Sequence, residues 1–221
     1  MPRTSLLIAL LLIVLGLSSC GGSDEPETES ETGPATTVTG CQAVSAPEPR
    51  GAQTVPEPEG ELDPDATHVA TVATNCGDFE ITLDVEAAPM TTSSFAHLVE
   101  LDFYDGLTFH RVSRGFVIQG GDPVGDGTGG PGYQVREAPP EAIAYEQGVV
   151  AMAKRGDEPA GVSGSQFFVV TEAADLAPDF ALLGRVTSGM ETVERIAASE
   201  VDNFEKPTEA VVIRDITIAT G

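Results

Sequence analysis

Short runs of alternating apolar and polar residues constrain this fold more than any other feature of the sequence. The run FEITLDV, residues 79–85, places its apolar side chains on one face, as a half-buried strand requires. The run HVATVAT, residues 68–74, precedes it across the turn NCGD, so the two predict a β-hairpin. Six further strands are predicted at residues 107–112, 115–121, 148–153, 165–170, 181–186 and 210–218.

Helical spacing occurs in two segments. Pro89–Leu101 has proline in its first turn and a one-sided apolar stripe, and Met190–Ala198 follows a predicted capping box from Ser188 to Glu191. Many short strands with two helices are typical of a closed β-barrel whose ends are covered. The predicted fold is therefore mainly β.

The N-terminus has the pattern of an export signal. Residues 1–19 carry one early cation and then an apolar run that is shorter than the roughly 20 residues of a membrane-spanning helix. The sequence Leu17-Ser18-Ser19-Cys20 resembles the bacterial lipobox, in which the cysteine thiol receives a diacylglycerol. The alternative is an ordinary signal with an incidental cysteine. We expect an extracytoplasmic protein held to the cell membrane by lipid on Cys20.

The segment that follows changes composition abruptly. Residues 21–66 are rich in Gly, Ser, Thr, Pro and Glu and contain no aromatic residue. Such a composition buries too little apolar surface to offset the entropy lost on ordering. The sequence thus predicts a disordered tether over residues 20–66, including the acylated cysteine, and one folded domain over residues 67–221.

The net negative charge of the chain argues against some classes of binding partner. The formal net charge is −24 at pH 7, with eleven Lys and Arg residues and no basic patch. Nucleic acid binding is therefore not expected. An acidic surface also repels anionic lipids, so the predicted anchor has to supply the affinity for the membrane.

Lipidation of Cys20 would leave Cys41 and Cys76, an even pair in an oxidising compartment. We predict a disulfide between them that joins the tether to the exposed hairpin turn NCGD. No Cys-x-x-Cys spacing supports a redox role. The bridge is expected to support stability rather than catalysis.

Five sequence blocks carry a family resemblance. FHRVSRGFVIQGGDP is followed in order by GDGTGGPGY, GVVAMAKRG, GSQFFVV and LLGRVTSGMETVERI. From about residue 68 to the C-terminus, their order and spacing resemble the cyclophilins, which are peptidyl-prolyl cis-trans isomerases. The resemblance implies an eight-stranded antiparallel barrel with two capping helices and a substrate groove on the outer face of the barrel.

The implied chemistry suits an arginine on an apolar strand. An X–Pro bond rotates across a barrier of about 18–20 kcal/mol, and catalysis needs a grip on the proline ring and a donor that favours the twisted amide. A guanidinium stays charged and can donate to both the pyramidal nitrogen and a nearby carbonyl oxygen. We expect Arg111 to supply this donor.

The resemblance implies the other site residues at matching positions. Phe116, Val117 and Phe168 would line the proline slot, which Leu176 and Phe180 would complete. Gln119 would orient Arg111 and the substrate carbonyl. The residues implied to flank the groove, where the residue before proline lies, are Ala153, Lys154 and Gln166, and Gly127 would let the peptide backbone approach.

Two function classes remain open at this stage. The first is an isomerase that helps exported proteins to fold, acts as a monomer and takes proline-containing polypeptides as partners. The second is a cyclophilin-fold module that binds such segments without useful turnover, against which the intact set of Arg111, Phe116 and Gln119 argues. No cofactor and no metal are expected, because the three histidines lack ligand spacing.

Overall fold

The structure is a computed structural model, and it describes residues 40–221. The predicted signal peptide of residues 1–19 and the predicted lipidation site Cys20 lie outside the described residues. The helices are α1 (Pro89–Glu100) and α2 (Met190–Ala197). The strands are β1 (His68–Thr74), β2 (Gly77–Leu83), β3 (Arg111–Ser113), β4 (Val117–Gly120), β5 (Val135–Arg136), β6 (Val149–Met152), β7 (Val162–Ser163), β8 (Phe167–Val170), β9 (Leu182–Ser188) and β10 (Ile213–Thr220).

Eight of these strands form one sheet, in the order β10-β1-β2-β9-β6-β8-β4-β3, and every neighbouring pair is antiparallel. Each lies within or overlaps a run predicted from the sequence, and β1 and β2 form the predicted hairpin with Val72 opposite Phe79. The small sheet of β5 and β7 was not predicted. The mainly β, antiparallel fold with two helices is thus confirmed.

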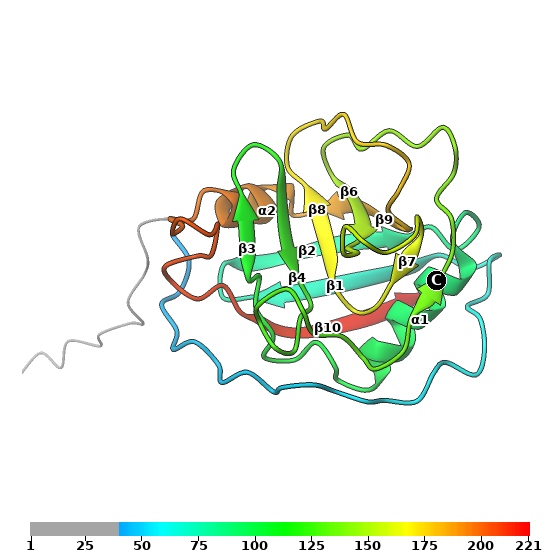
Figure 1. Cartoon of the computed structure of the whole chain (residues 1–221), viewed down its shortest axis with the longest axis horizontal. Helices are drawn as coiled ribbons and strands as arrows, with labels where there is room; N and C mark the ends of the chain where they lie inside the picture. The colour runs from blue at the N-terminus through cyan, green and yellow to red at the C-terminus, as the bar shows by residue number, and fades with distance from the viewer. Residues whose placement is uncertain (1–39) are drawn as a thin grey trace, which may run out of the picture. The chain divides into compact units, whose positions relative to one another are not determined.

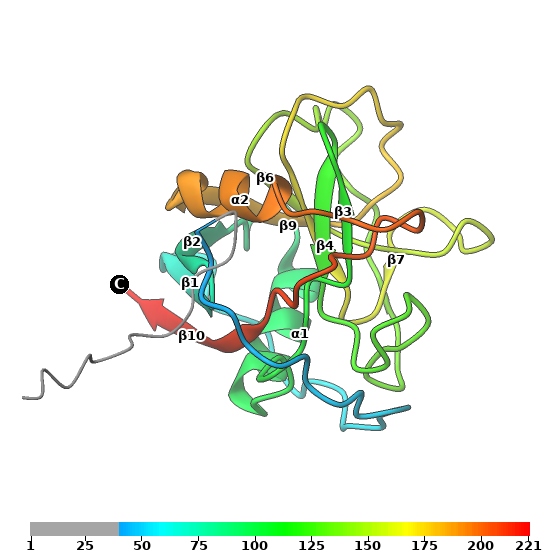
Figure 2. The ribbon, with the colours of Figure 1, turned by 90° about the vertical axis from the view of Figure 1, so that its left-hand side faces the viewer.

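The prediction of a closed barrel is wrong. The sheet curls into an open half-barrel, with β10 and β3 as its two edges (Figures 1 and 2). Next to these edges, residues 106–109 and 211–213 are joined by an isolated bridge between Thr108 and Val212 and by backbone hydrogen bonds. Strand β3 is three residues long, and Val112 within it donates its N–H to the carbonyl of Glu205 in a loop rather than to a strand. Within residues 40–221, the edge strands β3 and β10 themselves are therefore not paired with each other.

The alternation in the sequence decides which side chains are buried. In β2, Phe79, Ile81 and Leu83 point into the main core, while the intervening residues are partly exposed. Helix α1 packs against β10, and α2 packs against β2 and β4. Aromatic rings fill the space between these layers, with Phe95 and Phe109 each meeting Phe167 edge to face. The sheet is thereby held rigidly enough to support a site on its other face.

Helix α2 does not begin with the predicted capping box. Its N-cap is Gly189, at φ +74°, and no side chain caps the helix. A Cβ at residue 189 would lie 2.5 Å from the carbonyl oxygen of Asp78, so both the backbone conformation and the close approach to β2 require glycine.

The segment before β1 lies along the domain. Composition predicts disorder here, but residues 41–66 form an extended segment without regular structure that follows the outside of the domain (Figure 1). Val55 and Leu62 pack against the main core, and the N–H of Leu62 donates to Ser93 Oγ of α1 at 2.8 Å. Two apolar side chains and backbone partners thus supply contacts that the average composition does not reveal.

The predicted disulfide between Cys41 and Cys76 is present in the structure. Its position differs from the expectation in one respect, since Cys76 is 3% exposed and Asn75 next to it is also buried. Arg195 of α2 donates a hydrogen bond to the carbonyl of Cys76. The bridge therefore joins the segment 41–66 to a turn that is packed under a helix.

Candidate active site

The β3–β4 hairpin places Arg111 directly opposite Gln119. The two residues are Cα partners in the ladder, and Arg111 Nη1 donates to Gln119 Oε1 at 3.2 Å. Both side chains are partly exposed, on the face of the sheet away from the main core. The resemblance implied that Gln119 orients Arg111. The two residues are eight positions apart, and the tight turn between β3 and β4 brings them opposite each other.

A chain of hydrogen bonds continues from Gln119. Its Nε2 donates to Gln166 Oε1 at 2.9 Å, and Gln166 Nε2 donates to the carbonyls of Gly127 and Gly129 at 3.0 and 2.9 Å. Each amide in the chain therefore has a fixed orientation. The chain holds one face of Arg111 in place.

Glu205 holds another face of Arg111, and sequence reasoning missed this residue. Arg111 Nε donates to Glu205 Oε2 at 2.7 Å, and Ser113 Oγ donates to Glu205 Oε1 at 2.6 Å. The hydrogen bond from Ser113, followed by the interaction with Arg111, lowers the pKa of Glu205, so it is ionised at neutral pH. Glu205 has φ +62°, which is uncommon for a residue other than glycine. No motif marks it, because it lies in a separate loop.

Arg111 retains donors for a ligand. A guanidinium has five N–H groups. Among residues 40–221, Glu205 and Gln119 use two of them. The remaining three can donate to a ligand at a site where the direction of the guanidinium is already fixed.

An apolar cluster lies beside Arg111, separate from the main core. Phe168 at its centre is 4% exposed, and its ring meets that of Phe180 edge to face at 5.3 Å. Phe116 and Phe180 are only partly buried and so can contact a ligand. Six residues predicted to line or flank the groove belong to this cluster: Phe116, Val117, Ala153, Phe168, Leu176 and Phe180.

Tyr145 supports this cluster from behind and was not predicted. Its hydroxyl donates to the carbonyl of Phe180 at 3.0 Å and accepts from the N–H of Phe180 at 3.1 Å. Burial raises the pKa of Tyr145, which keeps the hydroxyl protonated as a donor. The loop that carries Phe180 is thereby fixed at that residue.

Lys154 also contacts the loop that carries Phe180. Its ammonium lies 2.8 Å from Asp179 and 5.7 Å from the ring centroid of Phe180, and it donates to the carbonyl of Glu158 at 3.1 Å. The side chain of Lys154 is 6% exposed. The ammonium of Lys154 is therefore directed at protein partners.

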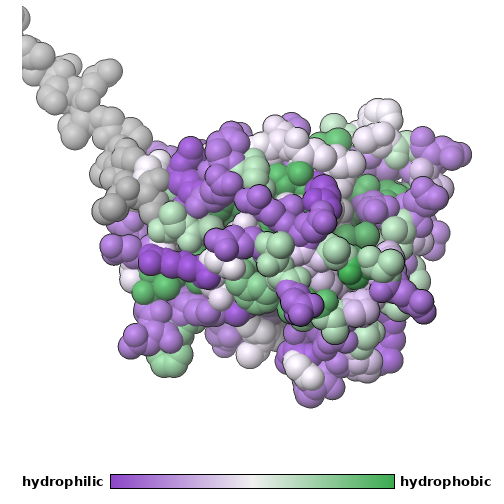
Figure 3. All heavy atoms as spheres, turned by 90° about the horizontal axis from the view of Figure 1, so that it is seen from above, coloured by the Kyte–Doolittle hydropathy of each residue, from purple (hydrophilic) through white to green (hydrophobic). Residues whose placement is uncertain are grey.

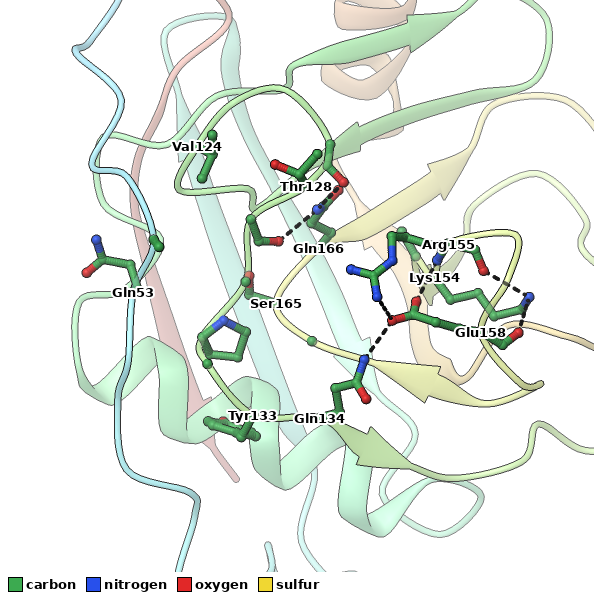
Figure 4. Close-up of a pocket in the computed structure, with 18 of the residues that line it drawn as sticks. Gln53, Val124, Thr128, Tyr133, Gln134, Lys154, Arg155, Glu158, Ser165 and Gln166 are labelled. Carbon is green, nitrogen blue, oxygen red and sulfur yellow. Dashed lines mark hydrogen bonds and ion pairs between the residues drawn. The ribbon is translucent and has the colours of Figure 1, made fainter.

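A pocket of about 630 Å³ is lined by Gln119, the hydrogen-bond partner of Arg111, and by Ala153 of the apolar cluster (Figure 4). Gln119 and Gln166 line it together with Gly127, which has φ +90° and open space beside its Cα. Ala153 and Lys154 line the pocket on another side. The structure thus brings the residues predicted to flank the groove around one cavity, which we call the groove pocket.

Figure 3 shows hydrophobic areas interrupted by hydrophilic side chains on one face of the molecule. In residues 40–221, no group of three or more His, Cys, Asp or Glu side chains is arranged to hold a metal ion. No helix within this same range is long and apolar enough to cross a membrane.

Comparison with known proteins agrees with this geometry. The sequence profile described as cyclophilin type peptidyl-prolyl cis-trans isomerase/CLD matches residues 69–218. The chain is 39% identical over 175 residues to peptidyl-prolyl cis-trans isomerase A of Mycobacterium tuberculosis (strain ATCC 25618 / H37Rv), which covers 71% of this chain and 94% of that protein. It is 44% identical over 124 residues to peptidyl-prolyl cis-trans isomerase B of Bacillus subtilis (strain 168), with 55% and 85% covered.

Solved structures show the same relationship. The crystal structure of a cyclophilin type peptidyl-prolyl cis-trans isomerase from Cryptosporidium parvum has a TM-score of 0.65 and 30% sequence identity, and the match covers 70% of this chain and 99% of that one. A structure of the same Cryptosporidium protein in the presence of the dipeptide Ala-Pro has a TM-score of 0.64 and 31% identity, over 69% of this chain and 99% of that one.

Proposed function

The chain belongs to the cyclophilin-type peptidyl-prolyl cis-trans isomerase family, and on that premise we propose that it rotates X–Pro bonds in exported proteins and assists their folding at the cell surface. Isomerase activity follows from the family and the named relatives. The cell-surface location rests on the apolar run of residues 1–19 and on the lipobox-like sequence that ends in Cys20.

Arg111 is the catalytic residue in this proposal. In the transition state the prolyl nitrogen loses its resonance with the carbonyl and becomes pyramidal and basic. A guanidinium N–H of Arg111 donates to that nitrogen and so stabilises the twisted amide more than either planar form. Because Gln119 and Glu205 already fix the guanidinium, little reorganisation is needed when the amide twists.

The apolar cluster holds the proline ring during rotation. Phe116, Val117 and Phe168 form the slot beside Arg111, and Leu176 and Phe180 close it. The ring stays fixed while the acyl part of the substrate turns, and that part extends into the groove pocket, where Gln119 and Gln166 present their amides. No covalent intermediate is formed, and no bond is broken.

The observation that carries this function is the fixed guanidinium of Arg111 next to an apolar slot. The test is a protease-coupled or NMR exchange assay on a short X–Pro peptide. The proposal predicts that the purified protein accelerates cis-trans exchange well above the uncatalysed rate, which has a time constant of roughly tens to hundreds of seconds. Peptide binding without acceleration would instead support a module that only binds.

The location is tested separately. Cys20→Ser should prevent lipid labelling and should either release the protein from membranes or leave its signal uncleaved. Unchanged labelling and fractionation of the variant would contradict the lipid anchor while leaving the isomerase activity in place. We also propose that the protein acts as a monomer, and light scattering during size-exclusion chromatography would contradict this by giving twice the monomer mass.

A further inference from the structure

The N-terminal segment contains an element that reaches the substrate groove from outside the family domain. The family match begins at residue 69. Residues 50–62, which we call the strap, precede it, yet Ala52 and Gln53 of the strap line the groove pocket together with Gln119 and Gln166. Figure 4 shows Gln53 on the strap, next to the loop that borders the pocket.

The strap clamps both ends of a glycine-rich loop. The N–H of Arg50 donates to the carbonyl of Pro123, and the N–H of Val55 donates to the carbonyl of Pro131, both at 2.9 Å. Between these points the loop contains four glycines, which gives its backbone unusual freedom in isolation. The two hydrogen bonds therefore fix a segment that would otherwise have many accessible conformations.

The strap and the end of this loop fit closely. Gly132 has φ +94°, and a Cβ there would lie 2.9 Å from the carbonyl oxygen of Gln53 and from Thr54 Cα. Further contacts hold the strap itself, since Arg50 Nη1 donates to the carbonyl of Phe103 at 2.9 Å and Val55 packs against the main core. The strap is thus a fitted part of the domain surface.

The clamped loop in turn holds the groove. The carbonyls of Gly127 and Gly129, in the middle of the loop, accept the two hydrogen bonds of the Gln166 amide. Gln166 accepts from Gln119, which accepts from Arg111. An unbroken series of contacts therefore runs from the strap, through the loop, to the amides that line the groove pocket.

From these contacts we infer that the strap is a positioning element for substrate recognition. By fixing the loop that orients Gln166, it sets the affinity for polypeptides that extend on the N-terminal side of the X–Pro bond, whereas a minimal X–Pro peptide is bound without its help. The inference rests on the proposed function, which places the N-terminal part of the substrate in the groove pocket.

Val55→Pro tests the inference, because it removes the N–H that donates to Pro131 and keeps an extended backbone possible. We expect KM for a peptide extended on the N-terminal side to rise about twofold to tenfold, as for the loss of one hydrogen-bonded contact, while the KM for a minimal X–Pro peptide stays unchanged. Val44→Pro is the matched control, since Val44 is 37% exposed, precedes the strap and donates no backbone hydrogen bond to residues 40–221.

Amide hydrogen exchange on the wild-type protein gives a second test that does not depend on folding of the variant. If the clamped strap favours the extended peptide, binding of that peptide must in return stabilise the clamp. Exchange at Arg50 and Val55 should therefore slow with the extended peptide and not with the minimal one.

Equal effects on both peptides, or no effect in either experiment, would overturn the role of the strap. If the wild-type protein binds both peptides without isomerising them, the proposed function fails instead, and the exchange experiment still decides whether the strap recognises the extended peptide.

Discussion

Arg111 and Glu205 form an ion pair at 2.7 Å although they lie on separate elements, a short edge strand and a loop near the C-terminus. The loop adopts a left-handed backbone conformation at Glu205, which is energetically unfavourable for a residue other than glycine. Ser113 completes the arrangement through the second carboxylate oxygen. A carboxylate that receives hydrogen bonds from both Arg111 and Ser113 limits the rotation of the guanidinium.

Glu205→Gln should lower kcat by about threefold to tenfold with little change in KM, because the guanidinium loses orientation while the proline slot is intact. The effect is moderate because both side chains are partly exposed, and solvent screens their interaction. Glu209→Gln is the matched control for charge, because the Glu209 side chain is exposed and forms no hydrogen bond or ion pair within residues 40–221. Equal kcat values for Glu205→Gln and the wild type would show that Gln119 alone is sufficient to position Arg111.

His110 should make folding stability depend on pH. It is 8% exposed, and its pKa is lowered mainly by burial; Asp122 and Asp126 act in the opposite direction, and Arg111 adds to the lowering. As pH falls below 6.5, the ordinary pKa of histidine, the unfolded chain therefore takes up a proton that the folded protein does not. The free energy of unfolding should decrease over this range.

The measurement is urea unfolding of the wild type and of His110→Gln at about pH 7 and about pH 5.5, on either side of the histidine titration. The wild type should lose more stability between the two values than the variant does. An identical pH dependence in both proteins would contradict a buried neutral His110.

The disulfide should contribute to stability without taking part in catalysis. Cys41 and Cys76 are 35 residues apart, and closing a loop of this size stabilises a protein by about 3–4 kcal/mol in the chain-entropy estimate. Cys41→Ser with Cys76→Ser should therefore lower Tm by about 6–16 °C, at about 2–4 °C per kcal/mol for a domain of this size. Turnover of a short X–Pro peptide at 25 °C should be unchanged, and a large loss of that turnover would mean that the bridge shapes the proline slot.

The sequence predicted most of the fold because strands such as β1 and β2 are half-buried, while β6 and β8 are short, fully buried apolar runs. Phe79, Ile81 and Leu83 alternate with polar residues in the printed chain as they do in the sheet. The strands β5 and β7 have two residues each, too few for any periodicity. The open edge between β3 and β10 depends on how far the sheet curls, which no local pattern encodes.

Some site residues could be predicted from the sequence and others could not. Four site residues lie in the sequence blocks that carry the resemblance: Arg111, Gln119, Gln166 and Phe168. Strand pairing brings Gln119 opposite both Arg111 and Phe168. Glu205 and Tyr145 act from distant loops, so their roles depend on tertiary structure alone. The strap was missed because average composition does not reveal the hydrogen bonds that a few backbone groups make.

The central claim is that Arg111 stabilises the twisted amide, and the most direct test is the turnover of Arg111→Ala on a short X–Pro peptide. The account predicts a folded variant whose kcat/KM is lower by about 10²–10³, the usual effect of removing one preorganised donor. Arg114→Ala is the matched control, because this neighbouring arginine donates to the carbonyl of Ser199 and should leave turnover unchanged. Wild-type turnover in folded Arg111→Ala would contradict the mechanism.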